Sequence, residues 1–348
     1  MKRLQIRLLA AMGLSAVGAA PATLTACGAR TGLPVWELEA DAGLDAEEPE
    51  VDASDAADAG PDVADAEPDV AEPPDAEPDV TMTVRRPFLV GASLRKASIV
   101  RRHDWGGATS PSPDLDRKTR ALLALAWSED GRDEHASIAA FARFTMLLLS
   151  VGAPPHFIIA SQRASLDEVR HARDCFALAD RYGAVAVGPS PLVVHDCLGL
   201  TSLVEIAALA AQEGCLGETI GVALVEEALA GARDPAVAEI LTRVHRDEIR
   251  HAELAWRFAR WAIERGGAPV RSAVETAILE AIAETRRTPI RDYGIDDDAW
   301  RAHGRLTCRE ARATSERAIR EVVMPCMEAL LQASPAATTS AITHPFPT

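Results

Sequence analysis

Residues 167–172 read Asp-Glu-Val-Arg-His-Ala and residues 247–252 read Asp-Glu-Ile-Arg-His-Ala, so the chain carries one short string twice. Each string places a glutamate and a histidine three positions apart. These residues are Glu168, His171, Glu248 and His251. Three positions are nearly one helical turn, so both side chains of a string project from one helix face toward a common point. This Glu-x-x-His spacing is how the cores of helical bundles hold two metal ions.

A lone glutamate precedes each string at a matched distance. Glu134 lies 34 residues before Glu168, and Glu213 lies 35 residues before Glu248. The chain therefore contains one unit twice, which predicts two helical hairpins, each with a lone glutamate on its first helix. Two such hairpins facing one another close a four-helix bundle whose pooled ligands are four glutamates and two histidines.

The charge of this set favours metal binding. Four carboxylates inside a bundle would carry a charge of −4, and desolvating even one unpaired carboxylate costs several kcal/mol. Two divalent cations cancel that charge, and mixed oxygen and nitrogen ligands suit iron or manganese, with zinc chemically possible. The alternative is that these are solvated charges on helix surfaces, as Arg170 and Arg250 nearby in the sequence would allow. A solvated face has no reason to repeat the spacing, so we favour the metal site.

These residues resemble the ferritin-like di-iron carboxylate superfamily, which includes rubrerythrins, ribonucleotide reductase small subunits, bacterial multicomponent monooxygenases and ferritins. The resemblance covers roughly residues 118–265. It implies an all-α, ferritin-like four-helix bundle holding two Fe ions, or Mn or a mixed Fe/Mn pair. Glu168 and Glu248 would bridge the metals. The other implied ligands are Glu134, Glu213, His171 and His251. The resemblance also implies that Asp167 and Asp247 hydrogen-bond the metal-bound histidine of the opposite helix pair.

The third helix offers a second carboxylate, Glu218. Glu213 and Glu218 are five positions apart, or about 140 degrees around an ideal helix, so both cannot point at one site without distortion. The spacing favours Glu213. However, Gly214 and Gly217 thin this helix and could accommodate a local bulge, which occurs often at functional sites. Glu218 therefore stays open as an extra ligand, a channel-lining residue or a simple polar contact.

Hydrophobic periodicity and helix breakers predict the remaining organisation. The first helix is expected over 115–151, with a break near Gly131 left open, and the second helix follows it and ends near 182. The third is expected over 200–230, and the fourth follows it and ends before 266. Two more helices are expected over 269–286 and 299–333. The resulting segments are a signal peptide (1–27), a tether (28–84), an irregular segment packed on the bundle (85–117), the bundle (118–266), C-terminal helices (267–335) and a tail (336–348).

The N-terminal segment has the features of an export signal. Basic residues precede a short, mostly apolar stretch at 8–20, and residues 24–27 read Leu-Thr-Ala-Cys, which resembles a bacterial lipobox. Cys27 would then be the lipidated first residue of an exported cell-envelope lipoprotein, on the periplasmic side or the cell surface. An ordinary cleaved secretory signal or a retained anchor are the alternatives.

Residues 37–80 contain eighteen acidic side chains and no Lys or Arg, so this segment alone carries −18 while the whole chain has a net charge of −16. Such a composition cannot bury enough apolar surface to offset chain entropy, so we expect a disordered tether extended by self-repulsion. The tether would hold the bundle away from a membrane. Weak gathering of cations by the acidic run is the alternative.

Several absences narrow the function. Ribonucleotide reductase small subunits carry a radical tyrosine one turn beyond the position of His171, where this chain has Cys175, and its only tyrosines are Tyr182 and Tyr293. That function is therefore disfavoured. The chain lacks a Gly-rich phosphate loop, a nucleophile motif and a basic nucleic-acid patch, so no nucleic acid is expected as a partner.

The leading hypothesis is a di-iron oxidoreductase that activates dioxygen or peroxide. It would use an electron donor and could act on a small organic substrate. Two alternatives remain open, namely iron oxidation or metal sequestration without an organic substrate, and a bundle in which the metal has only a structural role. Whether the enzyme hydroxylates, desaturates or removes peroxide is not readable from the residues.

Overall fold

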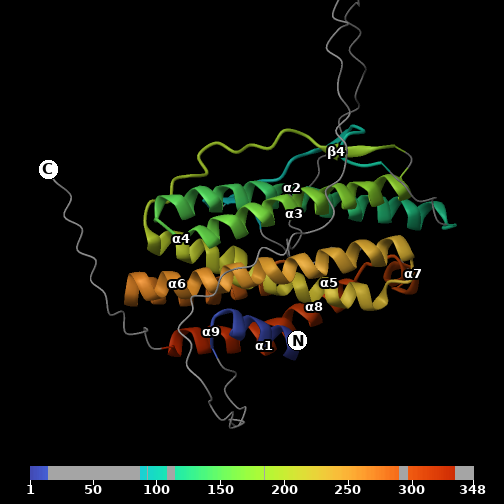
Figure 1. Ribbon diagram of the computed structural model, residues 1–348. Coiled ribbons are helices and arrows are strands. Elements are labelled where there is room, and N and C mark those ends of the chain that lie inside the picture. Colours follow the sequence, from blue (N-terminus) through green and yellow to red (C-terminus); the bar gives the residue numbers. More distant parts are fainter. Residues whose placement is uncertain (15–86, 92, 108–113, 184, 290–296, 334–348) are drawn as a thin grey trace, which may run out of the picture. The chain divides into compact units, whose positions relative to one another are not determined.

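The computed structural model describes residues 1–14, 87–91, 93–107, 114–183, 185–289 and 297–333 (Figure 1). Cys27, the predicted tether, Tyr293 and the predicted tail lie outside the described residues. The described part of the chain is mostly α-helical, as the sequence predicts.

The helices and strands follow one another along the chain with only short strands between the long helices. The helices are α1 (Lys2–Ala11), α2 (Arg117–Ser150), α3 (Pro155–Tyr182), α4 (Leu203–Ala210), the π-helix η1 (Ala211–Glu218), α5 (Thr219–Gly231), α6 (Pro235–Arg287), α7 (Asp297–Ala302), α8 (Cys308–Ala318), the π-helix η2 (Ile319–Val323) and α9 (Met324–Gln332). The strands are β1 (Leu89–Val90), β2 (Ser93–Leu94), β3 (Ile99–Arg101) and β4 (Val187–Pro189).

Helices α2 and α3 form the first hairpin. Asp116 caps α2 by accepting hydrogen bonds from the backbone N–H groups of Lys118 and Thr119, and Gly152 turns the chain with a φ of 63°. The sequence left open a break at Gly131, but α2 runs through it. A Cβ there would come within 2.9 to 3.0 Å of the ring of Phe176, so the glycine lets α3 approach α2 closely.

The second hairpin consists of the continuous helix α4–η1–α5 and the first part of α6. Ser202 and Glu205 form a capping box at the start of α4, and Asp234 caps α6 with Pro235 in its first turn. Helix α6 packs against α4, η1 and α5 and also contacts α3, which joins the two hairpins. In Figure 1 the layer of α2 and α3 lies above the layer of α5 and α6.

The predicted division between 266 and 269 corresponds to a kink inside α6. Gly267 adopts a φ of 65° there, and Pro269 follows within the same helical run, which continues to Arg287. The single helix predicted over 299–333 is divided instead. A turn separates α7 from α8, and Thr307 begins α8 with a second capping box. A hydrogen-bonded cap at Thr307 starts a new helix where periodicity alone had predicted continuity.

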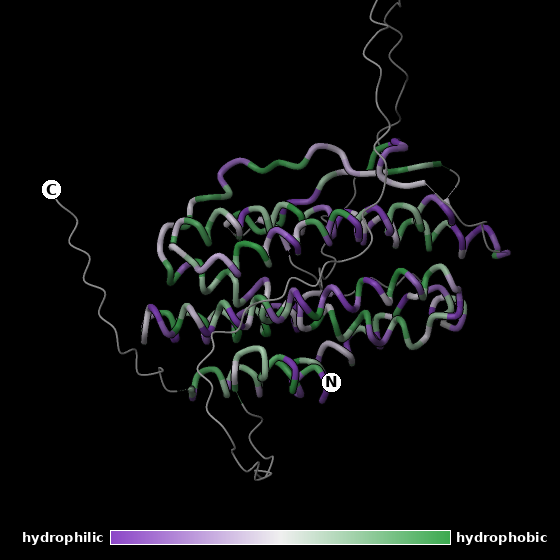
Figure 2. Tube along the Cα trace, in the orientation of Figure 1, coloured by the Kyte–Doolittle hydropathy of each residue, from purple (hydrophilic) through white to green (hydrophobic). Residues whose placement is uncertain are grey.

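The predicted irregular segment 85–117 contains short strands in its described part. Strand β1 pairs with β2, and β3 pairs with β4, each antiparallel. Phe88 is fully buried against Ala136 and Ala140 of α2, so this segment packs on the first hairpin. Figure 2 shows apolar and polar residues interleaved along the helices, as expected of amphipathic helices that share one core.

Helix α1, within the predicted export signal, belongs to the same compact unit as the other described helices. Its residues Leu4, Leu8, Leu9 and Met12 are buried in the largest apolar cluster. Among the described residues, one helix, Leu203–Gly231, is long and apolar enough to span a bilayer, and most of its apolar window is buried inside the body. A buried helix with such a window is what the core of a soluble bundle also contains.

Candidate metal centre

The four long helices bring six buried side chains of the predicted kind together. Helix α2 contributes one glutamate, α3 and α6 each contribute a glutamate and a histidine, and the end of η1 contributes the sixth residue. They are Glu134, Glu168, His171, Glu218, Glu248 and His251, each with at most 1% of its surface exposed. The reading of these residues as solvated surface charges is therefore incompatible with the fold.

These side chains form two adjoining groups. Ligand atoms of Glu134, Glu168, His171 and Glu248 all lie within 4.8 Å of one another, and those of Glu218, Glu248 and His251 do the same. Glu248 belongs to both groups. Glu168 also reaches both, because its Oε1 lies 3.0 Å from Nδ1 of His251 while its Oε2 lies 3.6 Å from Nδ1 of His171. Two neighbouring cation positions would thus share two carboxylates.

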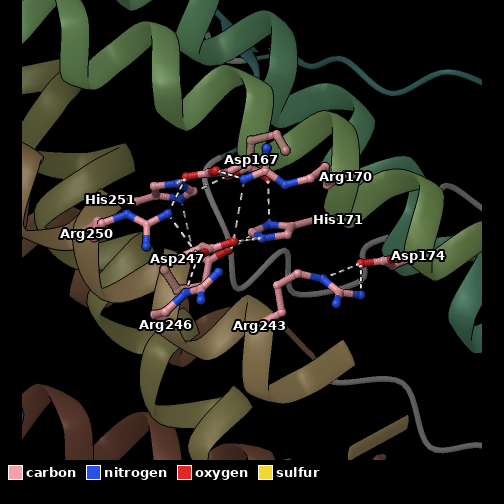
Figure 3. Close-up of polar contacts among 11 residues, drawn as sticks. Asp167, Arg170, His171, Asp174, Arg243, Arg246, Asp247, Arg250 and His251 are labelled. Carbon is pink, nitrogen blue, oxygen red and sulfur yellow. Dashed lines mark hydrogen bonds and ion pairs between the residues drawn. The ribbon is translucent and has the colours of Figure 1, made fainter. Parts of the chain in front are cut away.

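Each imidazole is oriented by an aspartate of the opposite hairpin (Figure 3). Nε2 of His171 lies 3.3 Å from Oδ2 of Asp247, and Nε2 of His251 lies 3.2 Å from Oδ2 of Asp167. A carboxylate accepts the Nε2 proton, which leaves Nδ1, the atom that faces the glutamates, as the nitrogen that could bind a cation once it has lost its own proton. This is the crossed contact that the resemblance implied.

The aspartates are held as carboxylates. Burial alone would raise the pKa of Asp247, but the hydrogen bond from His171 and the charge of Arg250 hold that pKa well below its usual value. The pKa of Asp167 is lowered in the same way against burial, by its contact with His251. Permanently charged acceptors fix the ring orientation of both histidines.

A layer of arginines covers the aspartates (Figure 3). Nη2 of Arg250 lies 3.0 Å from Oδ2 of Asp167 and 2.9 Å from Oδ1 of Asp247, and Nε of Arg246 lies 3.2 Å from the same Oδ1. Arg170 donates to Asp167 from α3. Arg170 also lies 3.9 Å from Oδ2 of Asp247, so the arginines of both strings form ion pairs that link α3 to α6 while remaining about half exposed.

The spacing in the sequence favoured Glu213 over Glu218 as a metal ligand, whereas the structure brings Glu218 to the other candidate ligands. Neither of the two groups includes Glu213, whereas Glu218 completes the second one. Glu213 instead forms an ion pair with Arg143 of α2, and both side chains are buried. Arg143 also donates to the carbonyl of Leu89 and stacks over Phe88, its guanidinium carbon 4.9 Å from the ring centroid.

The π-helix η1 explains why both glutamates point inward. Its hydrogen bonds run from residue i to residue i+5, so residues five apart lie nearly above one another instead of about 140 degrees apart. Glu213 and Glu218 stand at this spacing within Ala211–Glu218 and are 0% and 1% exposed. The end of η1 is tied to α6 because Nε1 of Trp256 donates to Oγ1 of Thr219 over 3.1 Å.

The donor set fits a pair of cations. The two carboxylate oxygens of Glu248 make no hydrogen bond with the part of the chain that the structure describes, and they lie 3.5 and 3.8 Å from the imidazole nitrogens. Burying a carboxylate whose contacts are this long costs several kcal/mol, which a cation between it and the imidazoles would offset. Burial alone would lower the pKa of His171, but the surrounding carboxylates raise it to about 10. In the absence of cations, protons on the imidazoles partly balance the glutamates.

Two other sequence features have plain structural surroundings. Cys175 is buried in the apolar cluster that contains Trp127 and Tyr182. Tyr182 lies further along α3, and its hydroxyl is 2.9 Å from Nδ1 of His303. The five cysteines of the described residues form no disulfide with one another.

No protein-family model, no curated protein and no solved structure matches the chain. The buried cluster of glutamates and histidines in a helical body is therefore the observation on which a function must be based.

Proposed function

We propose that this chain is a ferritin-like dimetal carboxylate protein and that it acts as an oxidoreductase on dioxygen or peroxide. The observation that carries the proposal is the pair of adjoining groups that share Glu248 and, through its two oxygens, Glu168. Such a set, with a Glu-x-x-His pair on each of two helices and a glutamate on each of two others, is that of dimetal bundles.

The residues divide the work at this centre. Glu168 and Glu248 would bridge two ions, Glu134 and His171 would complete one position, and Glu218 and His251 would complete the other. Iron is favoured, with manganese or a mixed pair as the alternatives, because the donors are oxygen and nitrogen without a thiolate. Bound iron would supply redox chemistry with dioxygen or peroxide that side chains lack.

The protein itself supplies orientation and a buried environment around the donors. The crossed aspartates fix both imidazoles, and the ring of Phe141 packs edge-on against His251 with centroids 5.0 Å apart. Buried walls keep bulk water from the donors and strengthen electrostatic interactions within the site. Electrons for turnover would come from a separate donor.

Metal loading tests the proposal. We expect the full-length chain, loaded anaerobically with ferrous iron, to hold about two ions per chain and to consume dioxygen. Glu168→Ala and His251→Ala should lose this loading. The control Glu239→Ala, at an exposed site on α6, the helix that carries His251, should keep it. Tight metal without dioxygen uptake would instead favour a structural metal. Ferrous oxidation with mineral build-up would favour sequestration.

We also propose that the chain is exported and attached to a membrane through lipid on Cys27. The support is the sequence pattern of residues 1–27, and the acidic tether would separate the body from the membrane. Cys27→Ser should move the protein from the membrane fraction to the soluble fraction of cells that express it. An unchanged distribution would contradict the anchor.

A further inference from the structure

The N-terminal helix is seated in the folded body by one apolar face. Leu4, Leu8, Leu9 and Met12 follow one another at helical spacing and are 6%, 0%, 2% and 2% exposed. Lys2, Arg3 and Arg7 lie on the exposed side. The helix is thus amphipathic, and it is inserted with the orientation that its sequence dictates.

The receiving surface is a groove made by three segments that are distant in sequence. Helix α1 packs against α6, η2 and α9, whose apolar residues belong to the same cluster as the four apolar residues of α1. In Figure 1 α1 lies beside α9, below the layer of α5 and α6. Helices α8 and α9 and the π-helix η2 also contact the bundle directly, so the groove lies where α1 meets α6, η2 and α9 together.

Charges on the rim match the helix that fills the groove. Arg7 forms an ion pair with Glu253 of α6, and the Met1 amino group lies 3.7 Å from Glu226 of α5. At the other end of α1, a Cβ on Gly13 would come within 2.9 Å of the Arg260 guanidinium, so the chain leaves the groove closely against α6. Apolar and charged contacts together define one occupant in one orientation.

We propose that this groove is a helix-binding surface whose occupant is α1, and that its occupation conceals the export signal of a chain that has folded. The second part rests on the proposed export. Recognition of a signal peptide requires its apolar stretch to be accessible. The first residues of that stretch, including Leu8 and Leu9, are buried in the folded chain. Folding and export therefore compete, and a chain that folds first keeps its signal in its own core.

Hydrogen exchange on the purified full-length chain tests the docking. Amide hydrogens of residues 5–12 should exchange much more slowly than those of an unstructured peptide. Glu253→Arg, which sets two positive charges against each other at Arg7, should speed this exchange by about fivefold, because an exposed ion pair contributes modestly to stability. The matched control is Glu239→Arg, the same change at an exposed position of α6, which should leave the exchange as it is. Unprotected amides in the wild type would overturn the proposal.

Processing in cells tests the concealment. Glu253→Arg lies outside the signal and leaves residues 1–27 unaltered, so it should raise the fraction of chains cleaved and lipidated at Cys27, while Glu239→Arg should not. If the wild type has protected amides and Glu253→Arg exchanges them faster, yet both are processed equally, concealment is refuted and the docking stands. If no variant is lipidated and Cys27→Ser changes nothing, the proposed export fails and the concealment falls with it.

Discussion

Arg143 distinguishes the two inward-pointing glutamates of the third helix, because it forms an ion pair with Glu213 and leaves Glu218 to the candidate metal ligands. Four carboxylates, on Glu134, Glu168, Glu218 and Glu248, face the cation positions, and two divalent cations would neutralise them. A fifth carboxylate, on Glu213, would leave an excess negative charge in a buried site. The guanidinium of Arg143 balances that charge locally, so Glu213 is neutralised without a metal.

The first prediction separates these two glutamates. Glu218→Gln should lower the metal content of the folded chain toward about one ion, because it removes a donor from only one of the two positions. Glu213→Gln should leave the metal content near that of the wild type. Metal analysis after gel filtration measures both, and a loss confined to Glu213→Gln would contradict the assignment of Glu218.

The second prediction concerns the buried ion pair itself. Arg143→Met should lower the free energy of unfolding of the metal-free protein by about 3 to 5 kcal/mol, since it leaves Glu213 charged and buried without its arginine. Replacing both residues, as Arg143→Met with Glu213→Leu, should recover most of that loss. Urea unfolding followed by circular dichroism gives the three values. A double variant no more stable than the single one would argue against the pair.

At the scale of elements, the short π-helix is what the sequence could not reveal. Ideal α-helical geometry, applied to Glu213 and Glu218, forces a choice between them, and the matched spacing to Glu248 favoured the first. Glycines at 214 and 217 permit a bulge but do not require one. The partner of Glu213 is Arg143, which is 70 residues away in the sequence. No local sequence pattern predicts an ion pair between residues so far apart.

The third prediction follows from the register of η1. Deleting Gly217 should return this segment to α-helical geometry with Glu213 and Glu218 four positions apart, about 40 degrees around the helix, so that both still face inward and the metal content stays near that of the full chain. Inserting one alanine after Gly217 should instead set them six positions apart, about 240 degrees on an α-helix, and one proposed cation position should be lost. Metal analysis after gel filtration measures both, and circular dichroism checks that each variant remains helical. Full metal content after the insertion would show that the register of η1 does not set the position of Glu218.

Other elements were predictable for simple reasons. Gly152 with Pro154, Gly183 and Pro235 end or begin helices where the sequence placed the boundaries. The duplicated strings also predicted that Glu168, His171, Glu248 and His251 meet in the interior. The docking of α1 could not be foreseen in this way. An export signal and a core helix share basic and apolar residues, so the sequence of 1–14 does not indicate that this segment packs into the folded body.

For the whole molecule, the proposed metal centre would join the two hairpins, because its side chains come from both. Helices α2 and α3 carry three of the donors, and η1 and α6 carry the other three. Cations bound between these glutamates would cancel the repulsion of their charges and so stabilise the association of the two hairpins. If the proposed metal centre forms, metal binding and folding are coupled.

The fourth prediction expresses that coupling. Ferrous or manganous ions at 100 times their dissociation constant should raise the free energy of unfolding by about 2.7 kcal/mol per bound ion, and a chelator should reverse the gain. Thermal unfolding under anaerobic conditions measures the shift in Tm. A variant carrying both Glu168→Ala and Glu248→Ala should not respond. A response equal to that of the wild type would place the binding elsewhere on the chain.

The reciprocal contacts between histidine and aspartate bear on how the body can deform. Each hairpin supplies one imidazole and one aspartate, and each of these meets its counterpart on the other hairpin. Sliding one hairpin along the other would lengthen both His–Asp distances together, so that neither contact could be kept while the other is lost. Shear is thus opposed at two points, and the gap between the cation positions is set by the backbone of both halves at once.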